Sequence, residues 1–160
     1  MSMIGSFLAI PQAELDALYV NPESVPTILY ETHKSEIVNI DKAWHGIHFM
    51  LTGEQYGGNG PLAKVIMGGV PIGEEDVGYG PARGMSASEV KEVAAALSGV
   101  SEEMFRAKFN QAAMNDADIY PQIWDESNEA LDYIAENFCE AKRFYEAAAS
   151  DGMAVILFVN

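Results

Sequence analysis

The sequence predicts one helix-rich α/β (or α+β) domain over residues 1–160, built around a small central sheet that includes both terminal strands. A length of 160 residues suits a single domain. Short apolar runs lie at both ends, over residues 2–9 and 153–159, and the second resembles a strand buried on both faces. Helical patterns fill the chain between them. Because a strand at the end of a chain needs a partner, we expect the two terminal runs to share one sheet.

Four short helices are expected in the first half of the chain, each bounded by Pro, Gly or a capping residue. Their ranges are residues 12–19, 26–33, 42–51 and 61–67. Pro11 suits the start of the first helix, because its missing N–H would have no intrahelical partner there. Asp41 has the side chain of a good N-cap for the third helix, and Gly53 is expected to end that helix.

Residues 53–84 are expected to form a long, turn-rich connection. They hold ten of the 14 glycines and three of the seven prolines, which excludes continuous helix or sheet. Connections of this kind often carry binding groups on a rigid scaffold. The segment contains neither a phosphate-binding loop motif nor a dinucleotide-binding fingerprint.

The second half of the chain carries clearer helix signals. Ser86-Ala87-Ser88-Glu89 is a capping box, and the helix that it starts is expected to end at Gly99. Ser101 caps a further helix. The longest helix is expected over about residues 126–150, because one apolar stripe repeats there at helical spacing, and Gly152 ends it.

The composition excludes several classes of protein. Nine basic residues against 24 acidic ones give a net charge of −15, which argues against nucleic acid or an anionic membrane as the main partner. We expect no membrane helix and no secretory signal, and so a cytoplasmic protein. Cys139 is the single cysteine, so no internal disulfide or cysteine-based zinc cluster can form.

The densest set of chemically active side chains lies in the expected third helix. Asp41, His45 and His48 stand at positions i, i+4 and i+7 and would share one face. They could bind a divalent metal or orient a general base. The favoured interpretation is structural, with Asp41 capping the helix and His48 packing beside its apolar stripe. We therefore expect no metal and no cofactor.

Two further sets of residues are candidates for binding. Tyr79 and Arg83 lie in the glycine-rich segment, and a guanidinium suits carboxylate or phosphate, although a local salt bridge is the favoured use of Arg83. Tyr120 and Trp124 alternate with carboxylates, a pattern that suits the rim of a protein interface. Together with Trp44, the residues Tyr79, Tyr120 and Trp124 are the candidate ligand-binding or partner-binding residues.

The sequence also resembles a known family. The block Asp41-Lys42-x-Trp44-x-x-x-His48-x-x-Leu51-Thr52-Gly53 is accompanied, in order, by Met3-Ile4-Gly5 before it and by Pro61-Leu62 and Ile119-Tyr120-Pro121 after it. This arrangement is similar to that of the YfbM-like family, a bacterial domain of unknown function, over nearly the whole chain. The resemblance implies one compact α/β domain and carries over no catalytic residue. His45 is not part of the block.

Two functions from different classes follow as hypotheses. The first is a non-enzymatic protein-binding module, antitoxin-like or immunity-like, whose negative charge attracts a basic partner protein. The alternative is a small-molecule or hydrolytic site where the helix of residues 41–53 meets residues 53–84. In that site Asp41 would orient His48 or His45, and Arg83 would hold an anionic group. Either a monomer or a homodimer is compatible with the sequence.

Overall fold

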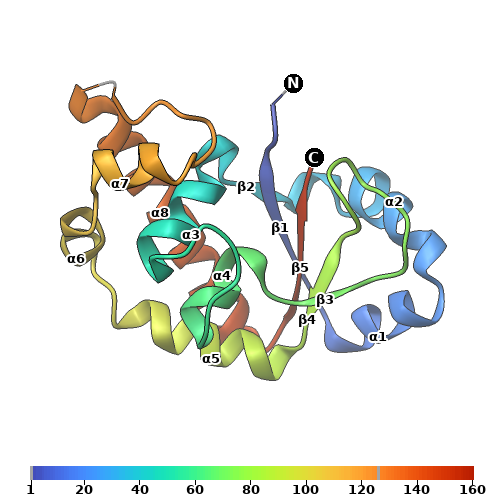
Figure 1. The fold of residues 1–160 in the computed structure, drawn as a ribbon. Coiled ribbons are helices and arrows are strands. Elements are labelled where there is room, and N and C mark those ends of the chain that lie inside the picture. The colour runs from blue at the N-terminus through green and yellow to red at the C-terminus, as the bar shows by residue number, and fades with distance from the viewer. Residues whose placement is uncertain (1, 126) are drawn as a thin grey trace.

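The computed structural model describes residues 2–125 and 127–160, and its centre is a five-stranded antiparallel sheet with helices on both faces (Figure 1). The strand order is β2-β1-β5-β4-β3. The strands are β1 (Gly5–Ile10), β2 (Val38–Asn39), β3 (Val70–Pro71), β4 (Arg83–Met85) and β5 (Ala154–Val159).

The two ends of the chain pair in the middle of this sheet, as the sequence predicts. β1 and β5 are antiparallel, and each of their six residues has a partner, from Gly5 opposite Val159 to Ile10 opposite Ala154. Successive side chains of β5 enter the two cores alternately, with Leu157 on one face and Ile156 on the other. The strand is therefore buried on both faces.

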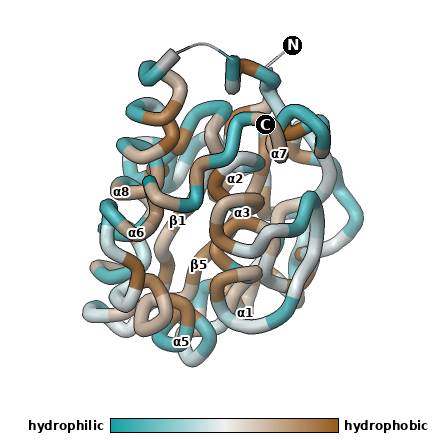
Figure 2. The backbone as a smooth tube through the Cα atoms, turned by 60° about the vertical axis from the view of Figure 1, so that its left-hand side comes forward, coloured by the Kyte–Doolittle hydropathy of each residue, from teal (hydrophilic) through white to brown (hydrophobic). Residues whose placement is uncertain are grey.

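Two helical layers of unequal size cover the sheet. Helices α3 to α8 and one face of the sheet form the larger core, and α1, α2 and the neighbouring turns form the smaller one (Figure 1). Figure 2 shows hydrophobic segments of α3 and β5 in the interior and hydrophilic segments around the outside. The α-helices are α1 (Gln12–Val20), α2 (Val25–Thr27), α3 (Trp44–Thr52), α4 (Lys64–Met67), α5 (Ala87–Ser98), α6 (Glu102–Ala107), α7 (Gln111–Asp116) and α8 (Ser127–Ser150).

Most helix boundaries confirm the sequence patterns. Ser86 accepts a hydrogen bond from the N–H of Glu89 at 3.2 Å, and Ser101 accepts one from Met104 at 3.1 Å. The expected start of α8 at Glu126 lies outside the described residues. Short turns complete the chain: the 3₁₀ turns η1 (Pro22–Ser24), η3 (Lys34–Glu36), η4 (Asp41–Ala43) and η5 (Pro61–Ala63), and the π-helical turn η2 (Ile28–Thr32). In the described chain, no helix combines the length and the apolar character needed to cross a membrane.

The expected N-cap role of Asp41 is wrong. The turn η4 precedes α3, no side chain caps either element, and Asp41 itself has a left-handed backbone with φ of 51°. Asp tolerates this conformation better than most residues. Its carboxylate instead accepts a hydrogen bond from the Tyr133 hydroxyl at 2.9 Å, which links η4 to α8. Gly53 does end α3 in the left-handed conformation, as predicted.

A glycine inside α3 allows unusually close packing. A Cβ atom at Gly46 would lie 2.5 Å from the Cδ1 atom of Ile134 on α8 and 2.7 Å from the ring of Trp124. Both distances are shorter than a carbon–carbon contact allows, so only glycine permits this approach. Helix α3 is thereby held close against α8.

His33 joins α1 to the turn η3. Its Nε2 lies 2.7 Å from the Glu14 carboxylate, and its Nδ1 contacts Glu36. The hydrogen bond to Glu36, followed by the one to Glu14, raises the pKa of His33 against the effect of desolvation.

We predict that H33Q destabilises the protein more in acid than in base. A raised pKa in the folded state means that the His33 contribution is complete below the unfolded value of about 6.5 and is lost as the pH rises through the folded pKa. The difference in free energy of unfolding should be under about 1 kcal/mol. Urea denaturation of both proteins at about pH 6 and about pH 9 measures it. A larger difference at the higher pH would contradict the assignment.

Candidate functional site

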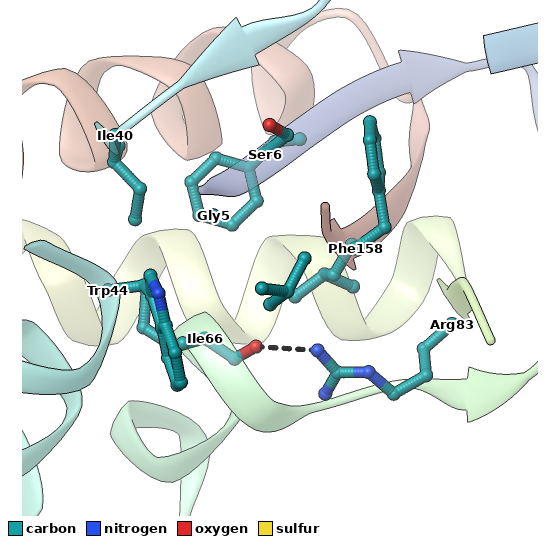
Figure 3. A pocket seen from close by; sticks show the side chains of 10 residues that line it. Gly5, Ser6, Ile40, Trp44, Ile66, Arg83 and Phe158 are labelled. Atoms are coloured by element: carbon teal, nitrogen blue, oxygen red, sulfur yellow. Dashed lines mark hydrogen bonds between the residues drawn. The ribbon is translucent and has the colours of Figure 1, made fainter. Parts of the chain in front are cut away.

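Trp44 and Arg83 line the same small cavity, between α3 and the sheet. Figure 3 shows Trp44 on one side and the guanidinium of Arg83 on the other, with Gly5 and Phe158 from the central strands between them. The cavity volume is about 10 Å³, close to the space that one water molecule needs. As it stands, this cavity is too small for a substrate.

Arg83 is engaged by backbone carbonyls rather than by a ligand. Its Nη1 donates to the carbonyl of Gly68 at 2.9 Å and its Nη2 to that of Ile66 at 3.0 Å. The hydroxyl of Tyr145 donates to the carbonyl of Val65 at 2.6 Å. Val65 and Ile66 lie in α4 and Gly68 is its C-cap, and a helix of four residues cannot satisfy these carbonyls itself. Arg83 and Tyr145 therefore cap α4 from β4 and α8.

The salt bridge favoured for Arg83 is not formed with any described residue. Burial lowers the pKa of this guanidinium, although the group remains charged at neutral pH. The reason for the difference is geometric. Residues 53–84 contain little regular structure, so their carbonyls need donors from elsewhere in the fold.

His45 connects two loops and is almost fully buried. Its Nδ1 accepts a hydrogen bond from the backbone N–H of Tyr120 at 3.0 Å, and its Nε2 donates to the carbonyl of Gln55 at 3.0 Å. This pattern requires the neutral tautomer with the proton on Nε2. Desolvation lowers the pKa of His45 and so favours that neutral form. Its ring stacks between Trp44 and Tyr56, each with a centroid distance of 5.1 Å.

His48 lies one turn further along α3 and is completely buried. Neither of its ring nitrogens makes a hydrogen bond with a described residue. Desolvation lowers its pKa, and the nearby carbonyl of Gly57 acts in the opposite direction without reaching hydrogen-bond geometry. A buried polar group without a partner is costly and rare in folded proteins. His48 does not line the cavity that contains Arg83.

The four candidate ligand-binding or partner-binding residues have different positions: Trp44 and Tyr120 hold the N-terminal segment, Tyr79 is exposed and Trp124 is buried. Trp44 donates from Nε1 to the carbonyl of Met3 at 2.9 Å, and the hydroxyl of Tyr120 accepts from the N–H of Met3 at 3.0 Å. Tyr79 is 41% exposed and remains available to a partner. Trp124, by contrast, is 0% exposed and donates to the carbonyl of Ile119 at 2.8 Å, so it offers no contact surface.

Neither a metal-binding cluster nor a reactive thiol is found among the described residues. In the described part of the chain, no three His, Cys, Asp or Glu side chains are grouped so that they could hold a metal ion. The thiol of Cys139 lies 3.1 Å from a Glu102 carboxylate oxygen, and desolvation and this contact raise its pKa, which keeps it protonated. From the sequence, Tyr133 is a candidate for a partner-contact patch and Tyr145 a member of the apolar stripe. Their hydrogen bonds to Asp41 and to the carbonyl of Val65 are not predicted, because helical spacing does not reveal a partner for a tyrosine hydroxyl.

We predict that R83M lowers the free energy of unfolding by roughly 1–3 kcal/mol, because two carbonyls of the α4 end lose their donors. Y145F, which removes one hydroxyl, should cost about 1 kcal/mol for the same reason. Urea denaturation at neutral pH measures both changes. A neutral effect of both substitutions would show that the end of α4 is satisfied in another way.

We predict opposite effects for the two buried histidines. H48L should leave the free energy of unfolding at about pH 7.5 unchanged or raise it by about 1 kcal/mol, because an unpartnered polar group is replaced by an apolar one. H45L should lower it by roughly 1–3 kcal/mol, because the groups of Gln55 and Tyr120 lose their partner. Equal losses in the two variants, measured by urea denaturation, would contradict this difference.

Comparison with known proteins agrees with this architecture. The structure is similar to the crystal structure of YfbM from Escherichia coli, a protein of unknown function, with a TM-score of 0.73 and 22% identity, covering 98% of this chain and 99% of that chain. At this identity the likeness shows the fold, and it confirms the α/β domain that the resemblance implies. No curated protein matches the chain. A family model described as a domain of unknown function, DUF1877, matches residues 1–158, and the chain belongs to this YfbM-like family.

Proposed function

We propose that this protein is a non-enzymatic cytoplasmic module that binds a basic partner protein, in the manner of an antitoxin or immunity protein. The observation that carries the proposal is an acidic hollow of about 410 Å³ on the outer face of α6 and α8. The described residues that line it include three carboxylates and one cation, Arg143. The lining carboxylates are Glu102, Glu136 and Glu140.

The charges around this hollow leave carboxylates without a cation. Arg106 pairs with Glu102 and Asp132, and Arg143 contacts Glu140. Glu103 and Glu136 are exposed and form no ion pair with a described residue. Negative charge that is unpaired within the chain attracts a positive surface over a distance and speeds the encounter.

The interior also favours a non-enzymatic role, because Asp41 and Arg83, two of the candidate catalytic residues, form hydrogen bonds that stabilise the fold. The carboxylate of Asp41 accepts the Tyr133 hydroxyl, and the guanidinium of Arg83 serves backbone carbonyls. His48 is sealed away from Arg83. A hydrolytic site that combines these three groups is therefore the less supported alternative.

The proposal predicts that neutralising the acidic hollow weakens partner binding. The variant E102Q/E136Q/E140Q should reduce the affinity for a captured basic protein by about tenfold or more, since three contact charges are lost. The control E23Q/E74Q/E75Q changes the net charge by the same amount on exposed residues outside the hollow and should keep the affinity.

The measurement is affinity capture from a lysate of the source bacterium, followed by calorimetric titration with the purified partner at low and high salt. Binding that weakens with salt and is lost only in the first variant supports the proposal. Equal loss in both variants, or binding that does not depend on salt, would contradict it.

A further inference from the structure

Residues 53–60 cover one side of α3 and are weakly attached to the fold. All eight are exposed, and the left-handed glycines Gly53, Gly57 and Gly60 have open space where a Cβ atom would lie. Among the described residues, no backbone–backbone hydrogen bond joins residues 54–59 to the rest of the protein. A segment with few such bonds opens more easily than the core.

The attachment of this segment runs through the imidazole of His45. Its Nε2 donates to the carbonyl of Gln55, and its ring stacks on Tyr56, which is itself 62% exposed. The hydroxyl of Thr52 adds a local bond to the N–H of Glu54 at 3.0 Å, which shapes the turn after α3. The contacts of His45 with Gln55 and Tyr56 are thus the main attachment of residues 53–60 to α3.

His48 lies beneath this cover, and neither of its ring nitrogens makes a hydrogen bond with a described residue. The carbonyl of Gly57, on the cover, favours protonation of His48, but desolvation outweighs it and lowers the pKa. Glu54 is the carboxylate whose charge favours protonation of His48, and it lies on the cover itself. On α3, His45 opposes a charge on His48. Two charged groups on the neighbouring elements are engaged elsewhere: Lys64 of α4 pairs with Glu89, and Asp41 of η4 binds Tyr133 of α8.

We propose that residues 53–60 are a proton-controlled flap, which lifts when His48 takes up a proton and uncovers the imidazole-bearing side of α3. A buried imidazolium without partners is strongly disfavoured, and water reaches it most easily through its weakest cover. Opening would join His48 to the hollow of about 390 Å³ that Leu51, Glu54 and Gly58 help to line. This inference does not depend on the proposed acidic docking face.

His48, rather than His45, is the group that controls the flap. A proton on His45 would enter at Nδ1, which faces the N–H of Tyr120, and the donation from Nε2 to Gln55 on the flap would persist. The closed state lowers the pKa of His48, so the open state binds the proton more tightly. The closed form is therefore favoured above the ordinary histidine pKa of about 6.5 and loses its advantage as the pH falls below that value.

Hydrogen–deuterium exchange of the purified protein at about pH 7.5 and about pH 5.5 tests the proposal, after correction for intrinsic exchange. The amides of Gly53 and Glu54 are hydrogen-bonded to the Phe49 carbonyl and the Thr52 hydroxyl, so their exchange reports on opening. Their exchange should rise on acidification, by up to about tenfold per pH unit for one linked proton, while β5 stays protected. The rise should vanish in H48L and persist in H33Q, which removes a histidine on the other side of the sheet.

A second measurement keeps the test decisive if H48L folds poorly. In the wild-type protein, a nuclear magnetic resonance titration should show flap amides that change with the midpoint of the His48 ring and not with that of His33. Flap exchange that does not depend on pH, an H48L response equal to that of the wild type, or flap amides that follow His33 would overturn the proposal.

Discussion

The pairing of β1 with β5 holds both helical layers of the protein in place. It joins the two ends of the chain in the centre of the sheet, and Ile4 and Asn160 extend it by exchanging backbone hydrogen bonds at 2.8 and 3.0 Å. Both helical layers pack on these strands, so each core contains residues from the first and the last segments of the sequence. Neither layer can form its core without this long-range contact, because β1 and β5 carry side chains of both cores.

The backbone carbonyls of the irregular segment, residues 53–84, need hydrogen-bond donors from other parts of the protein. Residues 53–84 leave carbonyls that no long helix or strand can pair, and buried side chains supply the donors. Arg83 and Tyr145 serve the end of α4, and His45 serves Gln55. Groups with catalytic potential are therefore used to hold loops. Among the described residues, His48 is the exception, because both of its ring nitrogens are buried without a hydrogen-bond partner.

The two proposals concern different regions of the larger layer. The acidic hollow lies on the outer side of α6 and α8, whereas the flap covers α3 beside the glycine-rich segment. One depends on unpaired charge at the surface and the other on the cost of placing charge in the interior. Both follow from solvation: water stabilises the exposed carboxylates of the acidic hollow, whereas a buried imidazolium has no water to stabilise its charge.

Local patterns in the amino-acid sequence were enough to predict the terminal strands, the capped helices and the turn-rich connection, because these depend on periodicity, Gly and Pro positions and local capping. They also located α3, with Gly53 at its end. The role of each polar side chain became clear from the folded protein. Asp41 binds Tyr133 instead of capping α3, Arg83 serves carbonyls instead of a carboxylate, and Trp124 is buried instead of exposed. These roles depend on partners distant in the sequence, and spacing along one chain contains no information about which surfaces will meet.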